Sequence, residues 1–201
     1  MPLLLADASP IIAFCNGNQH TLLAGVVRAT YGWIEVPHLV NTEVQDRCSR
    51  VGAENYLTMK AQGVIRPNRE AVLYGNDDDI LLHVLDLLDL EEGDVRARLK
   101  DGGEAFAVAY AVRHQKHGAE PCILMDDRKG RDWARRAGIP VLPTLWVFQE
   151  AKRRKLITTS AQMRVAYEAV ARFTQALRTL AEEPQLLADL SREQELTTRH
   201  T

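Results

Sequence analysis

The chain contains few cysteines, and they form no recognisable grouping. Cys15, Cys48 and Cys122 are widely separated and make no CxxC pair. This excludes the short, regular cysteine spacings of structural zinc sites and of disulfide-rich secreted domains. All three lie in or beside apolar stretches, so we expect buried free thiols in a reducing compartment and therefore a cytoplasmic protein.

Long apolar runs, internal repeats and low-complexity linkers are also missing. No stretch approaches the roughly 18 apolar residues needed to span a bilayer, so we expect no membrane partner. The 201 residues, 46% of them hydrophobic and 26% charged, are enough for one sizeable core with an extension.

The net charge of −2 hides an uneven distribution along the chain. Residues 70–104 contain eleven acidic and three basic residues, whereas residues 113–155 contain eleven basic and five acidic ones. On charge alone, two solvated faces are the simpler interpretation. The same pattern would also suit a cation site beside a surface that binds a polyanion.

Short apolar stretches alternate with helical segments over residues 1–155. The apolar stretches predict strands at 3–6, 33–36, 64–66, 122–125 and 139–142. Helical patterns fill the intervals, at 11–15, 21–29, 38–62 (divided by Gly52 near Ser49), 80–90, 104–117, 130–137 and 144–155. Ser9 is expected to cap the first helix. This alternation predicts a parallel central sheet covered by helices, an α/β fold.

The remaining segment, 156–201, shows only helical patterns. Helices are expected at 161–180 and 185–195, with a buried face that includes Met163, Tyr167 and Phe173 and a frayed end from Thr197. We therefore expect a domain at 1–155 and a C-terminal helical extension at 156–201 that packs on it.

Acidic residues stand at the ends of the predicted elements. Asp7 closes the first strand, and Asp126 and Asp127 close the strand at 122–125; Glu43 and Glu104 lie in helices. Ligands of open α/β sheets bind at the carboxyl ends of the strands, so one crevice could collect these acids. Clustered carboxylates repel one another unless a cation neutralises them, and oxygen ligands favour Mg²⁺ or Mn²⁺.

Each acid also has an ordinary structural interpretation. Asp7 could cap the helix that follows, Glu43 could be solvated, and Glu104 could simply favour a helix N-terminus. Asp126 and Asp127 could form a turn with a helix cap. The functional hypothesis therefore depends on the set and its order.

Basic side chains directly follow the last acidic pair. Arg128, Lys129 and Arg131 could hold the phosphates of a nucleic acid, as could the basic residues at 152–155. Trp133 and Trp146 are better explained as core residues than as platforms for stacking bases.

Together these features resemble the PIN-domain family of metal-dependent ribonucleases, particularly its branch related to VapC-like toxins. The segments that carry the resemblance span most of residues 3–157: LLLADASPIIAF, VPHLVNTEVQDR, DGGEAFAVAYA, ILMDDRKGRDWARRAGIPVLPTL and EAKRRKLI. The resemblance implies a flavodoxin-like α/β/α sandwich with a central parallel sheet, which would hydrolyse RNA phosphodiester bonds at a Mg²⁺ or Mn²⁺ site.

The resemblance also implies roles for individual residues. Asp7, Glu43, Glu104 and Asp126 would be catalytic, and the metal ligands would come from Asp7, Glu104 and the pair Asp126 and Asp127, with the choice within the pair left open. Ser9 and Thr144 would support the site. A homodimer and an antitoxin partner are further expectations.

Two alternatives compete with this hypothesis. A phosphatase-like hydrolase fits less well, because the second position after Asp7 is Ser9 and not a further aspartate. A receiver domain would have its acidic pair after the first strand and a lone aspartate later, and this chain has the reverse order. A noncatalytic binding or scaffold protein of PIN-like fold is favoured by the bulky Pro143 and Trp146, which could narrow the crevice.

Overall fold

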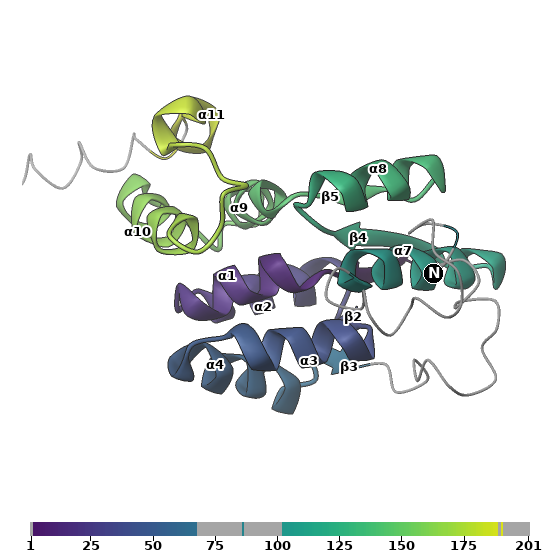
Figure 1. Ribbon diagram of the computed structural model, residues 1–201. Helices are drawn as coiled ribbons and strands as arrows, with labels where there is room; N and C mark the ends of the chain where they lie inside the picture. Colours follow the sequence, from purple (N-terminus) through teal and green to yellow (C-terminus); the bar gives the residue numbers. More distant parts are fainter. Residues whose placement is uncertain (1, 68–85, 87–101, 189, 191–201) are drawn as a thin grey trace, which may run out of the picture.

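The computed structural model describes residues 2–67, 86, 102–188 and 190, and its centre is a five-stranded parallel sheet (Figure 1). The strands lie in the order β3-β2-β1-β4-β5. Their bounds are β1 Pro2–Ala6, β2 Ile34–Val36, β3 Ile65–Pro67, β4 Glu120–Leu124 and β5 Val141–Leu142. The predicted α/β fold is confirmed. β5 is an edge strand, as Pro140 predicted.

Helices cover both faces of the sheet, because successive side chains of a strand point to opposite sides. In β1, Leu4 and Ala6 join one hydrophobic cluster, whereas Leu5 joins another. The first cluster lies under α1 (Ala8–Asn16), α2 (His20–Thr30), α4 (Arg50–Ala61), α9 (Thr144–Arg153) and α10 (Ser160–Ala171). The second lies under α7 (Gly102–Lys116) and α8 (Arg128–Arg136). The arrangement is an α/β/α sandwich.

The chain reverses its direction of winding between β1 and β4. It first builds outward from β1 to β2 and β3, and β4 then pairs with the other side of β1. Ala6 stands opposite Leu124, so the two strands end side by side. In doubly wound sheets this switch point opens the crevice in which ligands bind.

Several helix boundaries differ from those predicted. Asp7, and not Ser9, is the N-cap of α1. The long helix at 38–62 breaks at Cys48 and Ser49 into α3 (His38–Arg47) and α4, and Gly52 lies inside α4 instead of dividing it. Ser49 ends the continuity because its hydroxyl accepts the N–H of Gly52 and thereby caps α4.

The C-terminal helix is shorter than its apolar pattern predicted. α10 ends at Ala171, and Phe173 lies outside it with 47% of its surface exposed. Short turns of helix follow at Leu180–Glu182 and in α11 (Pro184–Leu187). Apart from residue 86, the helix predicted at 80–90 lies outside the described residues, as do 191–201 with the predicted fraying.

α10 nevertheless packs closely on the sandwich. The rings of Phe148 and Tyr167 are 5.0 Å apart, and Met163 and Val170 belong to the same cluster as Leu4. The extension therefore shares the core of the preceding residues, whereas the domain boundary at 155 stays a prediction. Among the described residues, no helix has the length and apolar character to cross a membrane.

Candidate functional site

Asp7 occupies the carboxyl end of the central strand. Its backbone N–H donates to the carbonyl of Leu124 at 3.0 Å and extends the pairing of β1 with β4 by one residue. Its carboxylate accepts the backbone N–H of Ser9 at 3.4 Å and caps α1. Only 1% of Asp7 is exposed. The Asp7 side chain therefore caps α1 and is also a buried acid at the end of the strand.

The surroundings of Asp7 disfavour its charged form. Burial and the negative charges of Glu104 and Glu43 together raise its pKa from 3.8 to about 7, against the lowering effect of the backbone N–H groups of Ala8 and Ser9. Two acids from other elements are thus close enough to disfavour the charge on Asp7.

Gly103 lies between two of these acids, at the start of α7. A Cβ atom at this position would lie 2.9 Å from Oε2 of Glu43 and 3.6 Å from Oδ1 of Asp7. The first distance is too short for a real Cβ contact, so the Glu43 carboxylate reaches into space that only glycine leaves open, and the Asp7 carboxylate borders that space. The next residue, Glu104, is half-buried and its Cβ would lie 3.0 Å from a Cβ at Gly130 of α8.

Asp126 and Asp127 have different surroundings. The backbone N–H of Thr144 donates to Oδ1 of Asp126 at 2.8 Å, and the Thr144 hydroxyl donates to Oδ2. Burial raises the pKa of Asp126, and the bonds from Thr144 and the charge of Arg131 oppose that rise. Asp127 is exposed and accepts the N–H of Gly130 at 2.8 Å, which makes it the N-cap of α8.

The acids lie near one another, but their side chains are not arranged as the ligands of a metal ion. Glu43 and Glu104 both act on the charge of Asp7, and Asp126 follows the strand that ends beside Asp7. Within the described ranges, no three carboxylate, imidazole or thiol side chains are spaced as they would be around a metal ion. The arrangement concentrates negative charge at the switch point of the sheet.

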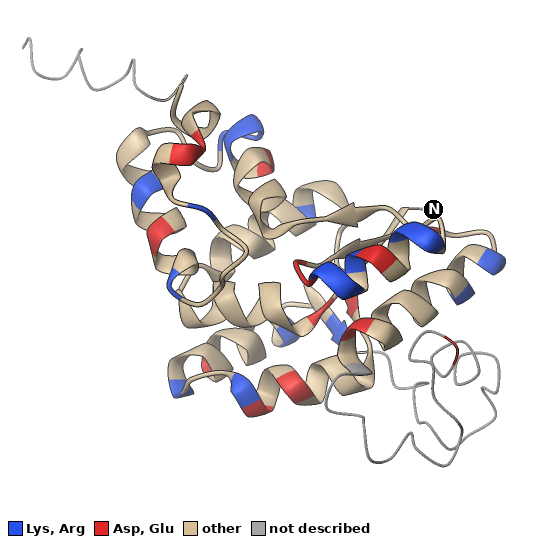
Figure 2. Cartoon of the chain, turned by 45° about the horizontal axis from the view of Figure 1, so that its top comes forward, with Lys and Arg blue, Asp and Glu red and all other residues tan. Residues whose placement is uncertain are grey.

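Basic residues extend from this point along α8, where Figure 2 shows several Lys and Arg segments in blue. Arg128, Lys129 and Arg131 are exposed. The ammonium of Lys129 lies 4.7 Å from the ring centre of Trp133, which is itself 5% exposed and belongs to the core.

The second basic segment, 152–155, is largely occupied by contacts within the protein. Arg153 and Arg154 both bind Glu150, and Lys152 donates to the carbonyl of Gln185. The predicted phosphate-binding role therefore fits α8 better than this segment.

Trp146 does not point into the crevice. Its ring lies 6.1 Å from that of Tyr31, which follows α2, and it packs against the cluster that contains Leu4. Pro143 is the residue that precedes α9 as its N-cap. The Trp146 side chain therefore packs between α9 and the end of α2.

Two residues near the acids were not singled out in the sequence. Gly103 is one, and the two consecutive glycines before Glu104 in the sequence could have indicated a close approach at this position. Arg47 is the other: it forms an ion pair with Oε1 of Glu43 one helical turn away. Their i,i+4 spacing on a predicted helix was sufficient to suggest this pair.

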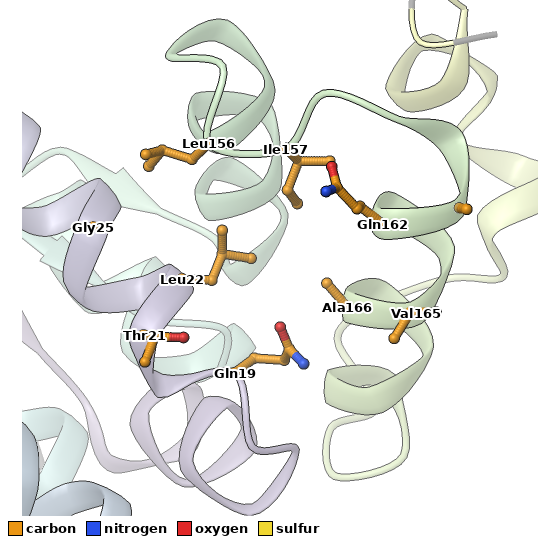
Figure 3. A pocket seen from close by; sticks show the side chains of 10 residues that line it. Gln19, Thr21, Leu22, Gly25, Leu156, Ile157, Gln162, Val165 and Ala166 are labelled. Carbon is orange, nitrogen blue, oxygen red and sulfur yellow. The ribbon is translucent and has the colours of Figure 1, made fainter. Parts of the chain in front are cut away.

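A separate pocket of about 560 Å³ lies between α2 and α10 (Figure 3). Leu22 and Gly25 face Ile157 and Ala166 across it, and the described residues that line it include no charged side chain. It therefore offers no acids for a metal and is distinct from the cluster around Asp7.

Comparison with known proteins agrees with the geometry. No curated protein matches the chain. A family model described as a PIN domain matches residues 3–170, from the start of β1 to nearly the end of α10. Proteins with this domain are generally nucleases. The match covers well over half of the sequence and includes every acid described above, and the chain therefore belongs to the PIN-domain family.

Proposed function

We propose that this chain is a Mg²⁺- or Mn²⁺-dependent ribonuclease whose site is built on Asp7, Glu43, Glu104 and Asp126. The observation that carries the proposal is the convergence of three acids around Gly103, where the pKa of the buried Asp7 is raised to about 7. Such a cluster gains stability from a bound cation.

The donor groups suit a hard divalent ion. All four side chains offer carboxylate oxygens, which Mg²⁺ and Mn²⁺ prefer. Gly103 leaves the open space that the carboxylates of Asp7 and Glu43 border. Asp7, Glu104 and Asp126 would hold the ion. Asp127 is a weaker candidate, because its carboxylate already caps α8.

The residues of the chain would orient the substrate around this centre. A bound ion would activate a water molecule and neutralise charge on the scissile phosphate. Thr144 fixes both oxygens of Asp126, and the N–H of Ser9 fixes Asp7. Arg128, Lys129 and Arg131 would bind neighbouring RNA phosphates through charge, without reading sequence.

RNA cleavage by the purified protein with Mn²⁺ tests the proposal. We expect Asp7→Asn and Glu104→Gln each to lower the cleavage rate by roughly 100-fold or more, because each removes charge from the centre. Asp46→Asn on the exposed surface of α3 and Glu120→Gln at the opposite end of β4 are matched controls and should retain the rate. Equal activity of all variants would contradict the assignment.

A measurement of metal binding distinguishes the ribonuclease from the alternative, a noncatalytic PIN-like binding or scaffold protein. Calorimetry should show Mn²⁺ binding to the wild type and weaker binding to Asp7→Asn. Absence of both binding and cleavage would favour the alternative. The packing of Trp146 on Tyr31 removes one of the reasons that supported it.

The biological setting is a further part of the proposal. We place the protein in the cytoplasm, as a homodimer that uses its helical extension at 156–201 and has a possible role as the toxin of a toxin–antitoxin pair. Light scattering that gives a strict monomer would refute the dimer. A neighbouring reading frame that encodes a small DNA-binding protein would support the toxin role.

A further inference from the structure

Two of the three cysteines lie next to each other in the fold although they are far apart in the sequence. Cys15 is in the last turn of α1 and fully buried, and Cys48 lies half-buried in the break between α3 and α4. The two side chains are close enough to shift each other's pKa. All three cysteines are free thiols, and Cys122 lies apart from the other two, with its thiol against the carbonyl of Leu3 in the sheet.

Hydrogen bonds hold the end of α1, which carries Cys15, against the segment from Cys48 into α4. The side-chain oxygen of Asn16 accepts the backbone N–H and the hydroxyl of Ser49, at 2.9 and 3.0 Å. Asn55 of α4 donates to the carbonyl of Cys15 at 2.9 Å. A Cβ at Gly52 would lie only 2.0 Å from that same Asn16 oxygen, so α4 approaches the end of α1 as closely as glycine allows. The closeness of the thiols is therefore built into the packing of three helices.

The two thiols are chemically unequal. Their interaction lowers the pKa of Cys48 and raises that of Cys15, whose burial raises it further. A thiolate is the reactive form of cysteine, and it must also be reachable from solvent. Cys48 meets both conditions better than Cys15, which would serve as its buried partner.

We propose that Cys15 and Cys48 form a reversible intramolecular disulfide, an oxidative modification site that is separate from the acidic centre. The Cys48 thiolate attacks a hydroperoxide, takes one oxygen as a sulfenic acid and releases an alcohol, or water from hydrogen peroxide. The Cys15 thiol then displaces water and forms the S–S bond. Two thiols and one peroxide thus give one disulfide, one alcohol and one water. The bond ties together the far ends of α1, which begins after Asp7, and α3, which carries Glu43.

Peptide mapping of the full-length protein tests this. The folded protein is treated with hydrogen peroxide, alkylated and digested without reduction. We expect a linked peptide pair containing Cys15 and Cys48 that dithiothreitol separates, and a thermal midpoint raised by roughly 5 °C or more. In urea, where the packing is lost, pairings with Cys122 should appear as well.

Variants assign the two roles. Cys122→Ser is the matched control and should form the same disulfide. Cys48→Ser should leave Cys15 as a free thiol, whereas Cys15→Ser should leave Cys48 as a sulfenic acid that dimedone traps. The wild-type map decides the proposal even if Cys15→Ser fails to fold. Oxidation of Cys48 with Cys15 still free, a bond between two chains, or a bond to Cys122 in the folded protein would overturn it.

Discussion

Asp7 and Glu150 are both almost completely buried carboxylates, with 1% and 7% of their surfaces exposed, yet their surroundings act in opposite directions. Hydrogen bonds from Arg153 and Arg154 outweigh burial and lower the pKa of Glu150 to about 2. Burial, Glu104 and Glu43 together raise the pKa of Asp7 to about 7.

The two pKa shifts differ because the charges beside Glu150 come from its own helix, whereas those beside Asp7 come from remote segments of the chain. The arginines of Glu150 stand three and four residues along the chain, so a local pattern neutralises the carboxylate. The neighbours of Asp7 come from α3 and α7, and they are acids. Buried acids with raised pKa values are concentrated at functional sites, which agrees with the proposed site, whereas a buried acid paired with arginines contributes to stability.

The largest effect is expected from Asp7→Asn in the metal-free protein. Unfolded Asp7 titrates near 3.8 and folded Asp7 at about 7, so the folded state holds the proton more tightly and stability falls as pH rises between these values. At about 1.4 kcal/mol per pKa unit, Asn should stabilise the protein by roughly 2–4 kcal/mol at pH 8. The gain should vanish near pH 4.

Urea unfolding with a chelator present measures this. Asparagine still caps α1, so the substitution removes the charge and keeps the hydrogen-bond acceptor. Asp127→Asn is the matched control: it changes an exposed cap of α8 and should leave stability nearly unchanged. A destabilised Asp7→Asn protein at pH 8 would show that the carboxylate is compensated after all.

A smaller effect of opposite sign is expected from Glu150→Gln. Loss of the charged hydrogen bonds should cost about 1–2 kcal/mol at pH 7, a figure reduced because Arg153 reaches solvent. The folded pKa is depressed, so the contribution of Glu150 is complete above about 4.5 and is lost as pH falls through about 2.

Denaturation at pH 7 and pH 3 measures the difference. Glu168→Gln, on the exposed side of α10, is the matched control and should behave like the wild type at both. If Glu150→Gln were as stable as the wild type at pH 7, the arginines would not be holding the carboxylate, and the contrast with Asp7 would fail.

The smallest effect is expected from Arg47→Gln. The pair of Arg47 and Glu43 is on a helix surface, with side chains 64% and 26% exposed, so its loss should cost less than about 0.5 kcal/mol. Arg50→Gln, which breaks the similar pair with Glu54, should match it. A loss above about 1 kcal/mol for Arg47→Gln alone would mean that Glu43 is clamped as Glu150 is.

Much of the fold could be predicted because its elements carry local signals. The apolar stretch at 122–125 and the position of Pro140 predicted a buried strand and an edge strand, and both are found. The PIN family was predicted from ordered segments and is confirmed. The helix at 161–180 was predicted too long, because an apolar spacing continues to Phe173 although the helix ends at Ala171 and Phe173 is 47% exposed.

The candidate site was less accessible to prediction. Asp7, Glu43, Glu104 and Asp126 could be proposed from position, but no local signal distinguished Asp126 from Asp127. The distinction depends on Thr144, which stands 18 residues later and reaches Asp126 only through the pairing of β4 with β5. Likewise, the nearness of Cys15 and Cys48 requires α1 to pack on α4.

By itself, the sequence determined the strands, most helices, their α/β order and the acids that could share a crevice, because periodicity and caps act over a few residues. Only the tertiary structure decided which charges meet in the interior. It left Asp7 without a local counter-charge and brought Glu43 and Glu104 towards it, whereas Glu150 received its arginines from its own helix. Electrostatic energies depend on distance and burial, and both are set by packing between remote segments.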